Sequence, residues 1–160
     1  MSSPARLARR AFLGAAALAA VLPAAACAQP RGPNAIAVYK TPTCACCDAW
    51  VRHLRAARFE VTVNVLPDLR GLRSSHGMPE ALASCHSALI EGYFIEGHVP
   101  PADVRRLVAE RPAAVGISVP GMPLGSPGME TPSGDREPYD TLLVLKDGTR
   151  RVFARHNAQI

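Results

Sequence analysis

The sequence predicts an α/β fold in one domain, and three observations support this. Strand-like and helix-like patterns alternate from residue 35 to residue 110, and a further pair of strand-like stretches closes the chain. The length of 160 residues suits a single domain with a substantial core. Hydrophobic residues make up 48% of the chain and charged residues 19%, which indicates a globular rather than a disordered protein.

Residues 1–28 are predicted to be an export signal of the twin-arginine type. Arg9 and Arg10 are followed by Phe-Leu and precede the apolar run Ala11 to Leu22, as in signals that export folded proteins. An ordinary Sec leader with two arginines is the alternative. Pro23 interrupts the run, which is shorter than the roughly 20 residues of a spanning helix, so no membrane span is expected in the mature chain. The predicted location is the periplasm.

Cys27 lies where this leader is expected to be cut. Small residues at Ala26 and Ala28 favour cleavage before Gln29, which discards Cys27. Lipid attachment at Cys27 is disfavoured, because the large aliphatic residue usual three positions earlier is replaced by Ala24. Three of the 18 basic residues leave with the leader, so the mature chain is close to balance with its 13 acidic residues. The sequence also lacks a run of Lys and Arg interleaved with aromatic residues. Nucleic acid is therefore not a predicted partner.

The mature chain is expected to begin with a linker over residues 29–34, followed by one domain over residues 35–160. A short apolar strand over 36–39 is stopped by Thr41-Pro42-Thr43. The next helix has one apolar face, formed by Trp50, Val51, Leu54 and Ala57. Alternating apolar and polar residues over 59–65 then predict a half-buried second strand.

Shorter elements follow in the middle of the chain. Asp68 opens a predicted short helix that ends near Gly77, and Pro79 starts a further helical turn. Residues 87–91 and 93–96 predict a hairpin with its turn at Gly92. The clearest amphipathic helix opens at Pro101 and ends before Pro112.

The last third combines a long loop with a hairpin. Residues 116–138 are rich in Pro, Gly, Ser and Met and lack periodicity, which predicts a loop of about 20 residues, and such loops are usually functional or disordered. Strands over 141–145 and 151–154 flank the turn Asp147-Gly148. The whole order, from strand, helix and strand to hairpin and helix, predicts a thioredoxin-like fold with an added Met/Pro/Gly-rich loop and a C-terminal hairpin.

Four cysteines are predicted to meet in this fold. Cys44 and Cys47 form a Cys-x-x-Cys after the first strand, at a helix N-terminus whose amides and dipole stabilise thiolates. Cys46 adds a third sulfur in the same turn. Cys85 and His86 precede the first hairpin strand, where a thioredoxin-like chain normally carries the cis-proline that faces the reactive pair. We therefore expect Cys85 and His86 to face the helix N-terminus.

Clustered thiolates favour soft metals such as copper(I), zinc or iron–sulfur. The two separate Cys-x-x-Cys knuckles of a structural zinc site are absent, so copper is favoured, with several ions bridged by the thiolates, and zinc is the alternative. Met122 and Met129 flank the Pro-Gly loop and are candidate thioether ligands or cover. His86, beside Cys85, is a candidate ligand or an outer partner of one. His98 is a further candidate ligand, or else a cap for the helix that follows it.

Two other functions compete with metal binding. The first is a thiol–disulfide oxidoreductase with Cys44 as nucleophile and Cys47 as resolving thiol. The second is a binding module stapled by two disulfides, the default for four cysteines in an exported domain. Whether the protein is an enzyme, acting on copper or on thiols, stays open at this point.

With these residues in view, the chain resembles the CopG-type family of periplasmic copper-resistance proteins. The resemblance runs from about Ala35 to Asn157 and is carried by four stretches, namely 39–47, 82–86, 96–100 and the loop 120–129. It implies a thioredoxin-like fold, a copper site of bridging cysteines and a part in copper tolerance, including conversion of copper(I) to copper(II). The ligands carried over are Cys44, Cys46, Cys47 and Cys85. The partners expected from this reading are copper ions and periplasmic copper-handling or electron-transfer proteins.

Overall fold

A computed structural model describes residue 32 and residues 34–157 of the chain. The predicted export signal, Cys27 and most of the predicted linker lie outside the described residues. None of the described helices is long and apolar enough to cross a membrane. The elements in chain order are β1 (Ala35–Lys40), α1 (Ala45–Ala56), β2 (Glu60–Val65), α2 (Arg70–Ser75), the 3-10 helix η1 (Glu80–Leu82), β3 (His86–Ile90), β4 (Tyr93–Gly97), α3 (Pro101–Glu110), β5 (Ala114–Val119), β6 (Tyr139–Leu145) and β7 (Arg150–His156).

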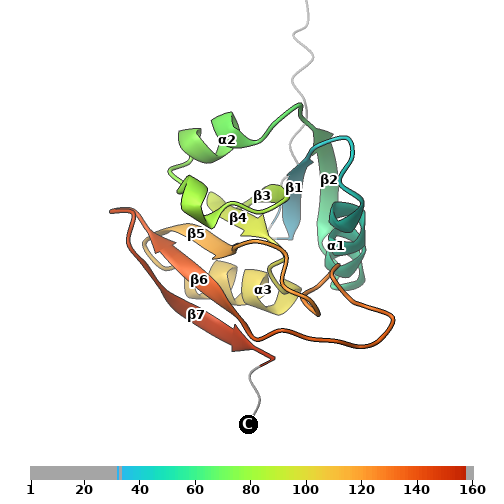
Figure 1. The fold of residues 1–160 in the computed structure, drawn as a ribbon. Helices are drawn as coiled ribbons and strands as arrows, with labels where there is room; N and C mark the ends of the chain where they lie inside the picture. Colours follow the sequence, from blue (N-terminus) through green and yellow to red (C-terminus); the bar gives the residue numbers. More distant parts are fainter. Residues whose placement is uncertain (1–31, 33, 158–160) are drawn as a thin grey trace, which may run out of the picture.

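The strands form one mixed seven-stranded sheet in the order β2-β1-β3-β4-β5-β6-β7 (Figure 1). Two pairs are parallel, β1 with β2 and β4 with β5, and the other neighbours are antiparallel. Parallel neighbours need a crossover, and α1 and α3 supply one each. Because β3 pairs with β1 in the register Lys40↔His86, the start of β3 lies beside the end of β1.

Two apolar layers cover the two faces of this sheet. The main core joins Trp50 and Leu54 of α1 and Leu107 of α3 to the sheet. A smaller core on the other face lies under α2 and η1 and includes Phe94 of β4. Figure 1 shows α2 and α3 on opposite sides of the sheet, as expected from side chains that alternate along a strand. The helix N-terminus that carries the cysteines is thus anchored by a continuous core.

The α/β prediction is confirmed, and the predicted elements are present as helices or strands at the expected places, including the hairpin around Gly92 and the closing hairpin β6–β7. The predicted start of the long loop at residue 116 is wrong, because β5 continues to Val119. This strand lies inside the sheet and is buried on both faces, so it shows no alternation, and Gly116 and Ser118 within it resemble loop residues. The loop therefore comprises residues 120–138.

The loop 120–138 returns toward the N-terminal half of the chain, and Figure 1 shows it reaching α1. The backbone N–H of Gly121 donates to the carbonyl of Ala83, and the Ser84 hydroxyl donates to the carbonyl of Gly121. Farther along, Gly128 lies directly against the backbone of Cys46 and Trp50. The loop is therefore packed across the cysteine-bearing end of the sheet.

Candidate metal centre

Three cysteines are positioned by the turn between β1 and the first turn of α1. The backbone N–H of Cys44 donates to the carbonyl of Thr41, which closes the turn, and Cys44 is the N-cap residue of α1. Its side chain makes no capping hydrogen bond, so the sulfur is not used to satisfy the helix amides. Cys46 and Cys47 follow within the first helical turn. All three sulfurs therefore belong to one rigid local structure.

The fourth sulfur comes from the segment between η1 and β3. Cys85 directly precedes β3, and the pairing of β3 with β1 places it against the start of α1. The Sγ atoms of Cys46 and Cys85 are 3.3 Å apart, and those of Cys44 and Cys46 are 3.5 Å apart. The ligand atoms of all four cysteines lie within 4.8 Å of one another. The structure thus brings the predicted cysteines together.

Two of these cysteines are joined, since a disulfide links Cys44 to Cys47. Cys46 and Cys85 are free thiols. Free thiols remain beside the disulfide, so the two-disulfide module considered from the sequence does not describe this structure. Two-electron reduction of the single disulfide would make all four sulfurs available as ligands.

Two buried histidines complete the site on the far side of Cys85. The Sγ of Cys85 is 3.1 Å from Nε2 of His98 and 3.3 Å from Nδ1 of His86. Nδ1 of His98 donates to the carbonyl of Pro127 at 2.9 Å, which leaves the Nε2 lone pair facing Cys85. The alternative in which His98 caps α3 is wrong, because that helix has no side-chain cap.

His86 carries an unpaired polar atom. Its Nε2 is buried and has no hydrogen-bond partner among the described residues, and its ring packs against Trp50 at a centroid distance of 4.4 Å. Since Nδ1 is the atom that faces the sulfur of Cys85, Nδ1 is the nitrogen through which His86 would bind an ion shared with Cys85, and Nε2 carries the ring proton. The cysteines form one potential ligand set, and Cys85, His86 and His98 form a second that shares Cys85.

Burial sets the protonation of these ligands. It raises the pKa of the Cys85 thiol to about 12, with the hydrogen bond and charge of Cys46 acting in the same direction. Burial also lowers the pKa of His86 to about 3, aided by His98, and lowers the pKa of His98. Both imidazoles are therefore neutral at neutral pH and able to bind a metal, whereas Cys85 releases its proton when a metal binds.

The shift of His86 predicts loss of stability in acid. Its folded pKa of about 3 lies below the ordinary value of 6.5, so its contribution is complete above pH 6.5 and is lost as the pH falls toward 3. We expect the free energy of unfolding of the metal-free protein to fall by more than about 1 kcal/mol through this group between about pH 6.5 and pH 4. Urea unfolding at both pH values measures it. The His86→Gln variant should lose less than the wild type, whereas replacement of the exposed His76 should leave the difference unchanged; equal losses in His86→Gln and the wild type would contradict the assignment.

Lys40 also contacts the site, although it was not among the site residues predicted from the sequence. Its ammonium donates to the carbonyl of Cys44 at 3.3 Å and pairs with the carboxylate of Asp48. It is 8% exposed at the end of β1. The available signal was its position in the stretch 39–47, directly before the turn that carries the cysteines.

The loop meets the site through Pro127 and Gly128, as shown by the contacts with His98 and with the backbone of Cys46. Met122 is 52% exposed and Met129 is half-buried. The expectation that the loop covers the site therefore agrees with its packing. Thioether ligation by Met122 or Met129 stays a prediction.

Changing Gly128 to alanine is expected to lift this cover. Gly128 has φ +87°, and an added Cβ would lie 2.8 Å from the backbone nitrogen of Trp50 and 3.0 Å from the backbone carbonyl oxygen of Cys46. We expect the loop to move and alkylation of Cys46 and Cys85 to become several-fold faster, measured by mass spectrometry. Gly134→Ala is the control, because Gly134 has φ +77° but no atom within 4 Å of an added Cβ. Equal alkylation rates in the two variants would show that the contact does not shield the thiols.

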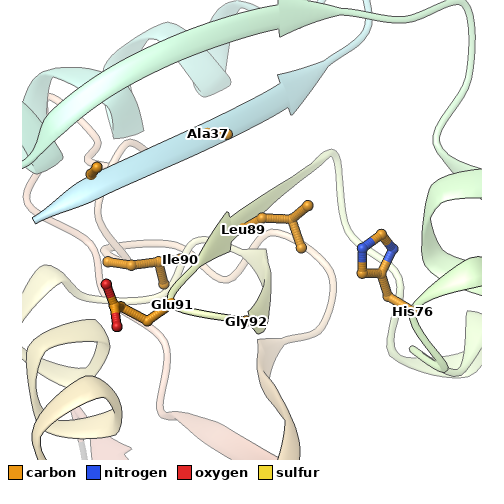
Figure 2. A pocket seen from close by; sticks show the side chains of 7 residues that line it. Ala37, His76, Leu89, Ile90, Glu91 and Gly92 are labelled. Carbon is orange, nitrogen blue, oxygen red and sulfur yellow. The ribbon is translucent and has the colours of Figure 1, made fainter. Parts of the chain in front are cut away.

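The structure also contains a cavity of about 200 Å³ away from the sulfurs (Figure 2). Figure 2 shows His76 near Leu89 of β3, with Glu91 and Gly92 at the turn after that strand. None of the predicted ligands lines it. Its lining offers no group of metal ligands, so the cysteine cluster remains the candidate site.

Comparison with known proteins agrees with this centre. Residues 82–129, which include Cys85, His86, His98 and much of the loop, match a family described as "Protein of unknown function, DUF411". The chain is similar to two solved structures of copper resistance protein CopG. Form 1 shares 41% identity with a TM-score of 0.74, covering 79% of this chain and 100% of that one. Form 2 shares 41% identity with a TM-score of 0.72, covering 76% and 96% respectively.

No curated protein matches the sequence. The two CopG structures nevertheless match over almost their whole length, with the same level of identity in each. On this basis the chain belongs to the CopG-type copper-resistance family.

Proposed function

We propose that this protein binds copper(I) in the periplasm and contributes to copper resistance. The observation that carries the proposal is the meeting of four cysteine sulfurs within 4.8 Å of one another, with two buried imidazoles beside Cys85. Thiolates are the ligands that copper(I) prefers, and neutral imidazole is compatible with it. The copper-resistance role of the similar CopG structures supports the same metal.

The arrangement favours more than one ion. A thiolate can bridge two soft metal ions, and Cys85 belongs both to the cysteine set and to the set with His86 and His98. The assigned ligands are Cys44, Cys46, Cys47, Cys85 and His86, with His98 as a further ligand. Zinc is the alternative metal, since it accepts the same donors.

A thioredoxin-like fold is part of this proposal. The sheet order β2-β1-β3-β4, with α1 and α3 as the two crossovers, supports it, and β5 to β7 extend that core. Residues 1–28 act as the twin-arginine-like export signal, cleavage discards Cys27, and residues 29–34 form the linker to the domain 35–160. Partners would be periplasmic copper-handling or electron-transfer proteins.

Copper(I) titration of the reduced protein under anaerobic conditions tests the proposal. We expect the wild type to take up at least one copper ion per chain, counted by elemental analysis after gel filtration, and to compete with a chromogenic copper(I) chelator. A parallel titration with zinc compares the two metals. Uptake below one copper ion per chain, or preference for zinc in mixed solutions, would refute copper(I) as the ligand.

Thiol–disulfide exchange is the second candidate function. The disulfide between Cys44 and Cys47 at the N-terminus of α1 favours it, because this is the place of a reactive pair. The two functions can share one site: oxidation of two copper(I) ions to copper(II) releases two electrons, which with two protons reduce one disulfide to two thiols. Insulin reduction by the metal-free protein measures the exchange alone. Strong reductase activity without copper uptake would favour this candidate.

A further inference from the structure

A buried ion pair lies behind the segment that carries Cys85. Glu96 of β4 is fully buried and Arg73 of α2 is 6% exposed. The Arg73 Nε donates to Glu96 Oε1 at 3.0 Å. Both charges have been removed from water, and apolar side chains of similar size commonly stabilise a fold equally well. The arrangement therefore calls for an explanation beyond stability.

Apart from a contact of Arg73 Nη1 with Glu80 at 3.4 Å, the other hydrogen bonds of this pair go to the residues that flank Cys85 and His86. The backbone N–H of Ser84 donates to Glu96 Oε1 at 2.7 Å, and Arg73 Nη2 donates to the Ser84 carbonyl at 2.7 Å. On the other side, the Ser87 hydroxyl donates to Glu96 Oε2 at 2.6 Å. Each carboxylate oxygen thus holds one end of a four-residue segment, with Cys85 and His86 between the ends.

Cys85 needs such support more than the other cysteines do. Cys44, Cys46 and Cys47 share one helical turn, so their spacing follows from α1. Cys85 lies outside regular structure, between η1 and β3. Its sulfur must nevertheless stay close to that of Cys46, 3.3 Å away, for both to bind the same ion.

We infer that Arg73 and Glu96 are positioning residues for the metal centre, which fix the Cys85-His86 segment against the three cysteines of α1. The inference rests on the proposed copper site. Arg73 and Glu96 do not bind the ion themselves. They act through their hydrogen bonds to Ser84 and Ser87. Outer partners of this kind commonly change metal affinity by about 10- to 100-fold when removed.

The test removes both charges together and measures copper(I) affinity by chelator competition on the reduced protein. The double variant Arg73→Met/Glu96→Leu is expected to bind copper(I) about 10- to 100-fold more weakly than the wild type. The conservative variant Glu96→Gln keeps an acceptor for Ser84 and is expected to stay within about threefold of the wild type. A loss in Glu96→Gln as large as in the double variant would overturn the inference, because the hydrogen bonds would then not be the cause.

Repeating the measurement in a Cys85→Ser background separates positioning from general stability. In the Cys85→Ser background the segment held by Arg73 and Glu96 supplies only His86, so Arg73→Met/Glu96→Leu should lower the residual affinity several-fold less than it does when Cys85 is present. An equal loss in both backgrounds would show a structural role and overturn the inference. If Cys85→Ser itself binds copper(I) like the wild type, the proposed site fails instead, and the two failures are thus distinguishable.

Two further variants guard against misfolding. Asp103→Asn is the matched control, because Asp103 is also a buried carboxylate but is held by Thr141 and His156. It should leave copper(I) affinity within about threefold of the wild type. If the double variant does not fold, as judged by circular dichroism, Ser87→Ala replaces it in the test, because it removes only the hydrogen bond from Ser87 to Glu96. Ser87→Ala should weaken binding at least about threefold when Cys85 is present and not when it is absent, and any other result would overturn the inference.

Discussion

Replacing Cys46 with serine is expected to weaken copper(I) binding by at least about 100-fold, more than the loss typical of an outer partner. The Cys46 sulfur lies 3.3 Å from that of Cys85 and 3.5 Å from that of Cys44. Its loss therefore separates the helix cysteines from Cys85, and a serine hydroxyl is a poor ligand for a soft ion. Chelator competition and copper counting on the reduced variant measure the effect.

The same variant separates the two candidate functions. Thiol–disulfide exchange needs Cys44 and Cys47, which form the disulfide, so Cys46→Ser should retain insulin reductase activity if that is the function. Val152→Ser, on the exposed surface of β7, serves as a control for substitution alone. Wild-type copper content in Cys46→Ser would contradict the assignment of Cys46 as a central ligand.

A change of Gly116 to alanine should destabilise the fold by about 3 kcal/mol, near the upper end of the usual cost of overpacking. Gly116 pairs with Phe94 between β5 and β4, and an added Cβ would lie 1.7 Å from the Phe94 carbonyl oxygen and 2.6 Å from its carbonyl carbon. Both atoms belong to the backbone, so the strands themselves must separate. Urea unfolding of the metal-free protein gives the change in the free energy of unfolding.

Gly71→Ala provides the matched comparison for that prediction. Gly71 lies in α2, and nothing lies within 4 Å of an added Cβ. Alanine at such a position should stabilise the protein slightly, by less than about 1 kcal/mol, because it restricts the unfolded chain and favours the helix. If Gly116→Ala were as stable as Gly71→Ala, the close approach of β4 and β5 would be incorrect.

The elements that the sequence predicted well are those whose periodicity reflects one buried face. The helix around Trp50 and the helix after Pro101 are amphipathic, and both contribute to the main core. Strand β5 was missed because an interior strand is buried on both faces and has no alternating pattern. Its Gly116 is explained only by the backbone of Phe94, which is a tertiary contact invisible in the local sequence.

The candidate site shows a similar division. The meeting of Cys85 with the helix cysteines was predictable from the order of elements, since that order places β3 beside β1. The role of His98 was left between ligand and cap, because the choice depends on the carbonyl of Pro127, 29 residues away. Glu96 lies in the stretch 96–100, but nothing in the sequence linked it to Arg73, because charged residues in short elements are usually solvated and only the fold buries these two.

The connection between β5 and β6 separates access to the metal centre from the architecture of the sheet. These strands are neighbours, so the chain between Val119 and Tyr139 has only a short gap to bridge, yet it extends as far as α1. The entropy of closing a loop grows slowly with its length. Grafts of longer, shorter or differently charged segments at this junction are therefore a route to tuning how quickly ions and chelators exchange, while the pairing of β5 with β6 is preserved.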